Sequence, residues 1–219
     1  FINQGFKDYR VFSNYGIILK NIGKLKEAEI STRKAIQLNP DLADAVFLLS
    51  CIQMMQDDYI TGLKNYESRF KTKKTKTKLH AQPKIPRWLG ESAKKGEKLL
   101  IISEQGLGDS IHFMRYIPCL REKGHEVIFC AQEQLHPIIK ESGIESNPIT
   151  IQQANQVLDG KYCPLLSLPL HLGVNQNNPI VSEPYISTKS EITAKWKDIF
   201  KKEERPIIGI SWQGNPSIE

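Results

Sequence analysis

The sequence lacks the features of several specialised protein classes. Its four cysteines are far apart and include no Cys-x-x-Cys pair, which argues against a disulfide framework and a zinc ribbon. No apolar run approaches the ~18 residues that a membrane span needs, and the chain shows no signal peptide. No cluster of His, Cys or carboxylates has metal-ligand spacing. We therefore expect a cytoplasmic protein with reduced cysteines, no membrane span, no metal and no resident cofactor.

Aromatic residues are missing from the most basic stretch of the chain. The 219 residues have a net charge of +6, and five lysines lie between Lys71 and Lys78. Proteins that bind single-stranded nucleic acid interleave such cations with aromatic side chains, on which the bases stack. The lysine run therefore favours a solvated linker, and we expect no nucleic-acid partner.

Three familiar motifs are also absent. There is no Gly-Lys-Ser/Thr of a P-loop and no Gly-x-Ser-x-Gly nucleophile elbow. A dinucleotide fingerprint needs a third glycine where Ile111 stands, and Glu126, the nearest acidic residue at the right distance, precedes the second strand instead of ending it. A nucleotide-binding oxidoreductase is therefore disfavoured.

Residues 9 to 42 have the spacing of a helical hairpin. Gly16 and Ala28 are small enough to let two helices approach closely, Gly23 stands where the turn needs it, and Pro40 would end the second helix. The pattern resembles the tetratricopeptide repeat, a helix–turn–helix unit of 34 residues. The matching positions are Phe12, Tyr15-Gly16, Leu19, Gly23, Glu27-Ala28, Ala35, Leu38 and Pro40.

A second, weaker copy of this repeat starts at Ala43. Gly62 and Arg69 replace its usual alanines, which suggests a terminal repeat whose outer face meets another part of the protein. Because about three repeats are needed to bury a continuous core, we expect further repeats upstream of Phe1 or docking on the next domain. The repeats would offer a protein-binding surface, or would serve as a spacer or oligomerisation element.

Beyond the repeats, composition and periodicity change twice. Residues 71–96 are charged, contain prolines and have no period, which is typical of a linker, and Trp88 near its end is expected to dock on the following domain. From residue 97 strand-like and helix-like segments alternate, which predicts a parallel sheet covered on both faces. Strands are expected over 98–103, 126–130, 148–151 and 206–212, and a helix is expected over 193–202. The domains we assign are helical repeats over 1–70, a linker over 71–96, a Rossmann-like domain over 97–205 and the start of a second such domain over 206–219.

The most informative segment of the chain is the turn that follows the first expected strand. The apolar residues Leu99–Ile102 lead into Gly106-Leu107-Gly108-Asp109, and an amphipathic segment follows at once. Ligands of open α/β sheets bind at the carboxyl ends of such strands, where Asp109 stands between small neighbours. On the residues alone, the pattern favours Asp109 as a cap that accepts backbone N–H groups of the following helix, and such bonds would make it a poorer base.

A wider pattern around this turn resembles a known enzyme family. The residues are Glu104 to His112 with Pro118 and Leu120 in the same helix, the run Cys163–Pro169, and the run Ile210–Pro216. Together they resemble the bacterial heptosyltransferases, inverting glycosyltransferases of the two-Rossmann-domain (GT-B) type. The combination with tetratricopeptide repeats is also similar to the protein O-linked N-acetylglucosamine transferases, although their catalytic motifs are not visible.

The resemblance implies a function and a set of site residues. It makes Asp109 the candidate general base on the acceptor hydroxyl, with a nucleotide sugar as donor substrate and a protein or polysaccharide as acceptor. The substrate-binding positions that match are Glu104, Gln105, Gly106, Gly108 and His112, together with Trp212, Gly214 and Asn215 of the expected second domain. Because the donor phosphates would be held mainly by that second domain, we expect residues 1–219 alone to be inactive.

Two of these interpretations have open alternatives. His112 could instead be a structural histidine, and Glu104 could bond only loop amides. The protein as a whole could be a non-catalytic tetratricopeptide scaffold that binds a partner and has a degenerate α/β domain.

Overall fold

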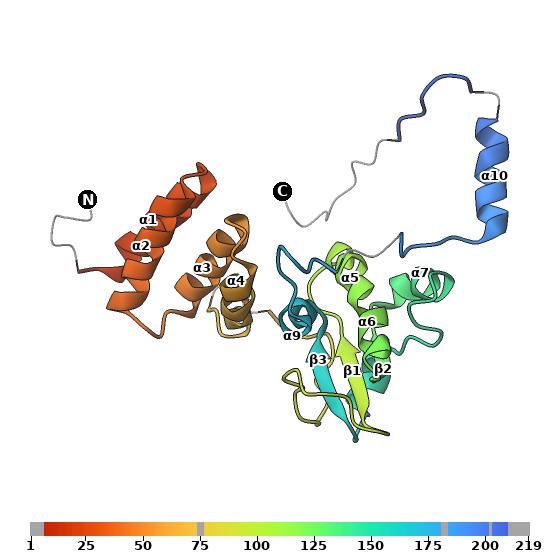
Figure 1. Cartoon of the computed structure of the whole chain (residues 1–219), viewed down its shortest axis with the longest axis horizontal. Helices are drawn as coiled ribbons and strands as arrows, with labels where there is room; N and C mark the ends of the chain where they lie inside the picture. The colour runs from red at the N-terminus through yellow and green to blue at the C-terminus, as the bar shows by residue number, and fades with distance from the viewer. Residues whose placement is uncertain (1–6, 74–76, 181–183, 202, 210–219) are drawn as a thin grey trace.

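The chain folds into a helical part and a mixed α/β part (Figure 1). The computed structural model describes residues 7–73, 77–180, 184–201 and 203–209. The helical part consists of α1 (Tyr9–Asn21), α2 (Leu25–Leu38), α3 (Ala43–Met55) and α4 (Tyr59–Tyr66), and the 3-10 helix η1 (Glu67–Phe70) follows directly. Among the described residues, no helix is both long and apolar enough to cross a bilayer.

Small residues bring the first two helices together. A Cβ added at Gly16 would lie 2.4 Å from Thr32 Oγ1, and Ala28 is fully buried between the helices. Gly23 has φ +77° in the connecting turn, a conformation that glycine adopts without strain. Asp8 caps α1 by accepting the N–H of Arg10 at 2.9 Å. The hairpin predicted over residues 9–42 is therefore present.

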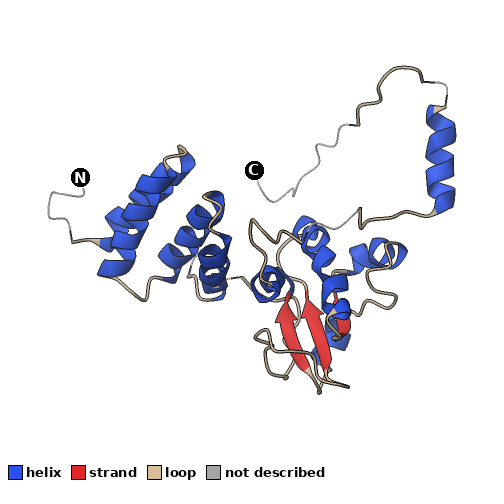
Figure 2. Ribbon diagram, viewed as in Figure 1, coloured by secondary structure: helices blue, strands red, loops and turns tan. Residues whose placement is uncertain are grey.

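The α/β part is built on three parallel strands, shown as arrows in Figure 2. These are β1 (Lys98–Ile102), β2 (Glu126–Cys130) and β3 (Lys161–Pro164), in the order β2-β1-β3. In the central strand, Leu100 pairs with Ile128 of β2 and with Tyr162 of β3. All of β1 except Lys98 is buried, as expected for a parallel strand covered on both faces.

Short helices connect the strands and cover them. The elements are α5 (Leu107–Phe113), η2 (Met114–Tyr116), α6 (Ile117–Glu122), η3 (Glu133–Leu135), α7 (His136–Glu141), α8 (Ile151–Asn155), η4 (Leu165–Ser167) and α9 (Leu168–Leu172). Leu99 and Ile101 of β1 face a core formed with α6, α7 and α9. Leu100 and Ile102 face a second core, which Ala154 of α8 helps to build.

The segment predicted to be a linker is part of this fold. Ala81 and Ile85 are buried in the second core, so the segment covers one face of the sheet. Trp88 is buried in the first core, as expected of a tryptophan that docks on its own domain. Backbone bonds join the segment to β3, because Trp88 N–H donates to Tyr162 O at 2.7 Å and Tyr162 N–H donates to Pro86 O at 3.0 Å.

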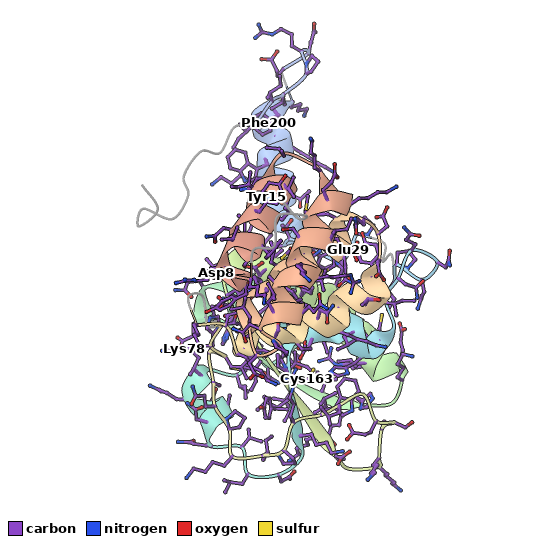
Figure 3. The ribbon with its side chains drawn as sticks, turned by 90° about the vertical axis from the view of Figure 1, so that its left-hand side faces the viewer. Asp8, Tyr15, Glu29, Lys78, Cys163 and Phe200 are labelled. Carbon is purple, nitrogen blue, oxygen red and sulfur yellow. The ribbon has the colours of Figure 1, made fainter. Side chains whose placement is uncertain are left out.

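The helix α10 (Ser190–Phe200) stands away from the rest of the molecule (Figures 1 and 3). Figure 3 labels Phe200 at its far end, well apart from Cys163 in the sheet. None of its residues is buried, and Ile192, Trp196 and Ile199 expose about half of their surface. The helix expected over residues 193–202 is thus present, displaced by a few residues.

Two expected strands are not observed. Of residues 148–151, Ile149 forms only an isolated bridge with Cys130, and Ile151 begins α8. Residues 206–209 are described and form no strand, and Ile207 and Ile208 are 52% and 82% exposed. A strand needs a neighbour with which to exchange backbone hydrogen bonds, and no described strand lies beside this segment. The remainder of the expected strand, and the start of a second domain over 206–219, lie mostly outside the described residues.

Candidate functional site

The loops that leave the three strands meet at the carboxyl edge of the sheet. The strand β1 ends before Ser103 and Glu104, β2 ends before Gln132, and β3 leads into η4. The strand order reverses at β1, since β2 lies on one side of it and β3 on the other. In open α/β sheets such an edge is where ligands bind. At this edge one side of β1 is filled by side chains and the other is exposed.

On the β3 side of β1, a side chain from the helical part fills the edge. Arg69 of η1 is 1% exposed and makes a bidentate ion pair with Glu104, with Nη2 at 2.8 Å from Oε1 and Nε at 3.0 Å from Oε2. Arg69 Nη2 also donates to Ser167 Oγ at 2.8 Å. Glu104 is fully buried, and its Oε1 accepts a third bond, from the backbone N–H of Leu166.

A second layer of charges surrounds this pair. Glu67 accepts from Arg69 Nη1 at 2.7 Å and from Ser167 Oγ at 2.8 Å, and it also pairs with Arg87. Burial alone would raise the pKa of Glu67, but the Arg69 and Arg87 guanidiniums outweigh it and hold that pKa below its usual value. Burial alone would lower the pKa of Arg69, and Glu104 and Glu67 keep it above its usual value.

This network decides the role of Glu104. Both of its oxygens are already bonded and none of its surface is accessible, so it offers no group to a ligand in this structure. Neither sequence interpretation describes these contacts fully. Glu104 bonds one backbone amide, that of Leu166 in η4, and its main partner is the Arg69 guanidinium of the helical part.

The β2 side of β1 is open. Gln105 is exposed and has φ +62°, an unusual conformation for a residue other than glycine that tends to occur at functional sites. Its side-chain N–H donates to the Tyr66 hydroxyl at 3.2 Å. Gly106 and Gly108 are exposed as well, and neither has a positive φ. A Cβ at Gly108 would lie in open space, so neither packing nor backbone strain requires glycine there.

Asp109 lies in the first turn of α5 and is half-buried. Its Oδ2 accepts the backbone N–H of Gly106 at 3.0 Å, which is half of a capping box, because glycine has no side chain to return the bond. No described group hydrogen bonds its other oxygen, Oδ1. Asp109 therefore does stabilise the helix start, and one of its carboxylate oxygens remains available at the open side of the edge.

A residue that the sequence did not single out holds this turn to the next strand. Gln132, just after β2, accepts from Ser110 Oγ at 2.8 Å, and its N–H lies 3.4 Å from Gln105 O. Its two bonds fix the start of α5 against the exit of β2. Gln132 lies two residues after an expected strand, at the carboxyl edge, which is the signal that could have identified it.

His112 lies on the exposed side of α5. Its Nδ1 is 3.2 Å from Arg115 Nη2, and partial desolvation together with the Arg115 charge lowers the pKa of His112. Arg115 also reaches Tyr185, whose hydroxyl donates to Ile111 O at 2.9 Å. His112 is therefore neutral near neutral pH, its Nδ1 is engaged by Arg115, and no described group hydrogen bonds its Nε2.

The structure thus brings Gln105, Gly106, Gly108, Asp109 and His112 together on one exposed turn, and separates Glu104 from them by burial. Trp212, Gly214 and Asn215 lie outside the described residues. Within the part of the chain that the structure describes, no three His, Cys, Asp or Glu side chains are grouped as metal ligands would be. Comparisons of the chain with protein-family models, with curated proteins and with solved structures gave no match.

Proposed function

We propose that this chain is the repeat-bearing, acceptor-side part of an inverting glycosyltransferase. In this proposal a sugar passes from a nucleotide sugar to a hydroxyl group of a protein or polysaccharide. The helices α1 to α4, as tetratricopeptide repeats, bind the acceptor or another protein partner. The α/β part is the first of two Rossmann-like domains, and the donor site belongs mainly to the second.

The observation on which the proposal depends is the geometry of Asp109. A general base must approach the hydroxyl that it deprotonates to within hydrogen-bond distance. Asp109 Oδ1 accepts no bond from any described group, whereas Oδ2 is held by Gly106 N–H at 3.0 Å. That bond orients the carboxylate, and the open space above Gly108 leaves room for an acceptor. Neutral hydrogen-bonding groups of Gln105 and His112 lie on the same turn and suit a sugar or a side-chain hydroxyl.

Asp109→Asn tests this assignment in the protein expressed from its whole reading frame. The amide keeps the size of the side chain and can still accept the Gly106 bond, but it cannot take a proton. We expect the transfer rate from a panel of radiolabelled nucleotide sugars to fall by about 10²–10⁴-fold, the usual contribution of a general base. Binding of the sugar nucleotide should be unchanged.

The matched control is Asp198→Asn in α10, which removes the same charge from an exposed position. It should transfer sugar at the original rate. Full activity in Asp109→Asn would exclude Asp109 from the mechanism.

A non-catalytic scaffold remains the second candidate. The observation that favours it is the Arg69–Glu104 pair, which fills the β1/β3 side of the edge where a ligand could otherwise bind. In that case no nucleotide sugar would be turned over by the protein from the whole reading frame, and the repeats would still bind a partner.

A further inference from the structure

One residue of the exposed turn has a backbone conformation that its type rarely adopts. Gln105 has φ +62°, in the left-handed region, where the Cβ of a glutamine crowds the backbone. Such a conformation persists only where surrounding contacts hold it. Gln105 lies between the buried Glu104 and Gly106, whose N–H donates to Asp109 Oδ2 at 3.0 Å. The conformation of Gln105 therefore sets the direction in which the chain enters the Asp109 turn.

The contact that holds the Gln105 side chain comes from the helical part. Its Nε2 donates to the hydroxyl of Tyr66, the last residue of α4, at 3.2 Å. With the residues that the structure describes, the Gln105 side chain makes no other hydrogen bond. The backbone C=O of Gln105 is held only by the longer bond from Gln132 Nε2, at 3.4 Å. The Tyr66 hydroxyl is thus the main restraint on the Gln105 side chain.

Tyr66 is itself fixed by its neighbours. Its ring centroid lies 5.6 Å from that of Phe47 in α3 and 4.6 Å from the Arg69 guanidinium. Arg69 is in turn bound by Glu104, the residue before Gln105. Burial raises the pKa of Tyr66, so its hydroxyl stays protonated and neutral near neutral pH. Two consecutive residues of the loop after β1 therefore bond to two residues of the helical part that contact each other.

We propose that Tyr66 is a positioning residue for the Asp109 turn. Its hydroxyl holds Gln105 in the left-handed conformation, and Gln105 holds the following turn in the geometry that leaves Asp109 Oδ1 without a described partner. Tyr66 contacts no reacting atom and acts only through Gln105. This inference rests on the proposed glycosyl transfer and deepens it, because it makes the helical part determine how the base is oriented.

The test compares Tyr66→Phe with the unaltered protein, both expressed from the whole reading frame. Phenylalanine keeps the ring contacts with Phe47 and Arg69 and loses only the hydroxyl. We expect the backbone amides of residues 105–110 to exchange hydrogen about three- to tenfold faster, the effect of one lost hydrogen bond on local opening. In sugar transfer, kcat should fall by about tenfold with an unchanged KM for the nucleotide sugar, because orientation of the base and not donor binding is altered.

A second variant approaches the same bond from its other side. Gln105→Ala should accelerate exchange of the turn as much as Tyr66→Phe does, and the double variant should accelerate it no further. The matched control is Tyr59→Phe, which removes from the same helix a hydroxyl that no described group hydrogen bonds. It should change neither the exchange of residues 105–110 nor kcat.

Four results would overturn the proposal. They are unchanged exchange in Tyr66→Phe, equal acceleration in Tyr59→Phe, additive effects in the double variant, and faster exchange in Tyr66→Phe with an unchanged kcat. Failure of the proposed function is distinguishable from these results. In that case the unaltered protein would transfer no sugar, while hydrogen exchange would still show whether Tyr66 orders the turn.

Discussion

At the scale of single residues, the buried pair of Arg69 and Glu104 has the largest energetic consequence. Both side chains are almost completely inaccessible to water. Each is stabilised by the other and by hydrogen bonds, and the Arg69 guanidinium also lies over the rings of Tyr66 and Phe70. Removing one member leaves an uncompensated charge, whereas replacing both by apolar side chains does not. Arg69 stands where a repeat of this type has alanine, so its departure from the pattern was the signal of this contact.

We predict that Glu104→Gln lowers the free energy of unfolding by up to about 3–5 kcal/mol, because Arg69 stays buried with only Glu67, which it shares with Arg87, as its counter-charge. Urea denaturation measures the change. Arg69→Met/Glu104→Leu should lose clearly less than Glu104→Gln alone. Glu122→Gln, an exposed change of the same kind, should shift stability by less than about 0.5 kcal/mol. A loss below about 1 kcal/mol in Glu104→Gln would contradict the account of this pair.

Histidines beside Trp88 give the fold a pH dependence. The ring centroids of His171 and His125 lie 5.0 and 5.2 Å from that of Trp88, in edge-to-face contacts. Burial lowers the pKa of His171, and the nearby Arg87 lowers it further, against the opposite effect of Glu67 and Glu91. Burial likewise lowers the pKa of His125. The unfolded chain therefore binds more protons than the folded chain when pH falls through their ordinary pKa of about 6.5.

The stability that these histidines contribute is fully present above about pH 6.5 and is lost as pH falls below it toward their folded pKa. We predict that the free energy of unfolding decreases from pH 7 to pH 5, and that His171→Gln reduces this slope. Urea unfolding at half-unit pH intervals measures it. The slope should decrease again in His125→Gln/His171→Gln, and an unchanged slope in the double variant would contradict the prediction.

At the scale of elements, what the sequence could predict depended on where each element finds its partners. The first hairpin has its partners nearby in sequence, and Gly16, Gly23 and Ala28 indicated it correctly. The strands β1 and β2 were recognisable because continuous burial gives them apolar runs. The strand β3 (Lys161–Pro164) was not predicted, because it is short and has no run of apolar residues. These residues form a strand only because they pair with β1.

In segment 77–96 and at the carboxyl edge, too, local sequence could not predict structure that depends on distant partners. A proline-containing, aperiodic sequence looks like a linker, yet its backbone bonds to Tyr162 and its buried Ile85 depend on the sheet beside it. The turn at Gly106–Asp109 could be located from local sequence. The burial of Glu104 could not, because its partner Arg69 is 35 residues away and belongs to the helical part.

Two glycines provide a matched test of the hairpin. Gly16→Ala would place a methyl group 2.4 Å from Thr32 Oγ1, so either Thr32 gives up its bond to Ala28 O or α1 and α2 separate. We predict a loss of about 1–3 kcal/mol in the free energy of unfolding, as in other overpacked interiors. Gly108→Ala adds the same methyl group in open space and should change stability by less than about 0.5 kcal/mol. Thermal or urea denaturation measures the stability of both variants. Equal effects would show that the close approach of α1 and α2 does not require a glycine at position 16.

At the scale of the whole molecule, the helical part is joined to the sheet by charge as well as by chain connectivity. Arg69 of η1 reaches Glu104 after β1 and Ser167 after β3, so the end of the helical part closes one side of the carboxyl edge. The other side, at Asp109, stays open. This arrangement fixes the surface of α1 to α4 relative to the proposed acceptor site, which suits a protein that presents a bound partner to that site.

The most direct test of the account is the anomeric configuration of the product. The protein expressed from its whole reading frame is incubated with nucleotide sugars and acceptor, and proton NMR determines the new glycosidic linkage. An α-linked donor should give a β-linked product, and Asp109→Asn should abolish it while Asp198→Asn does not, because direct displacement by a deprotonated hydroxyl inverts the anomeric carbon. Retained configuration, or an inverted product formed equally well by Asp109→Asn, would contradict the proposed mechanism.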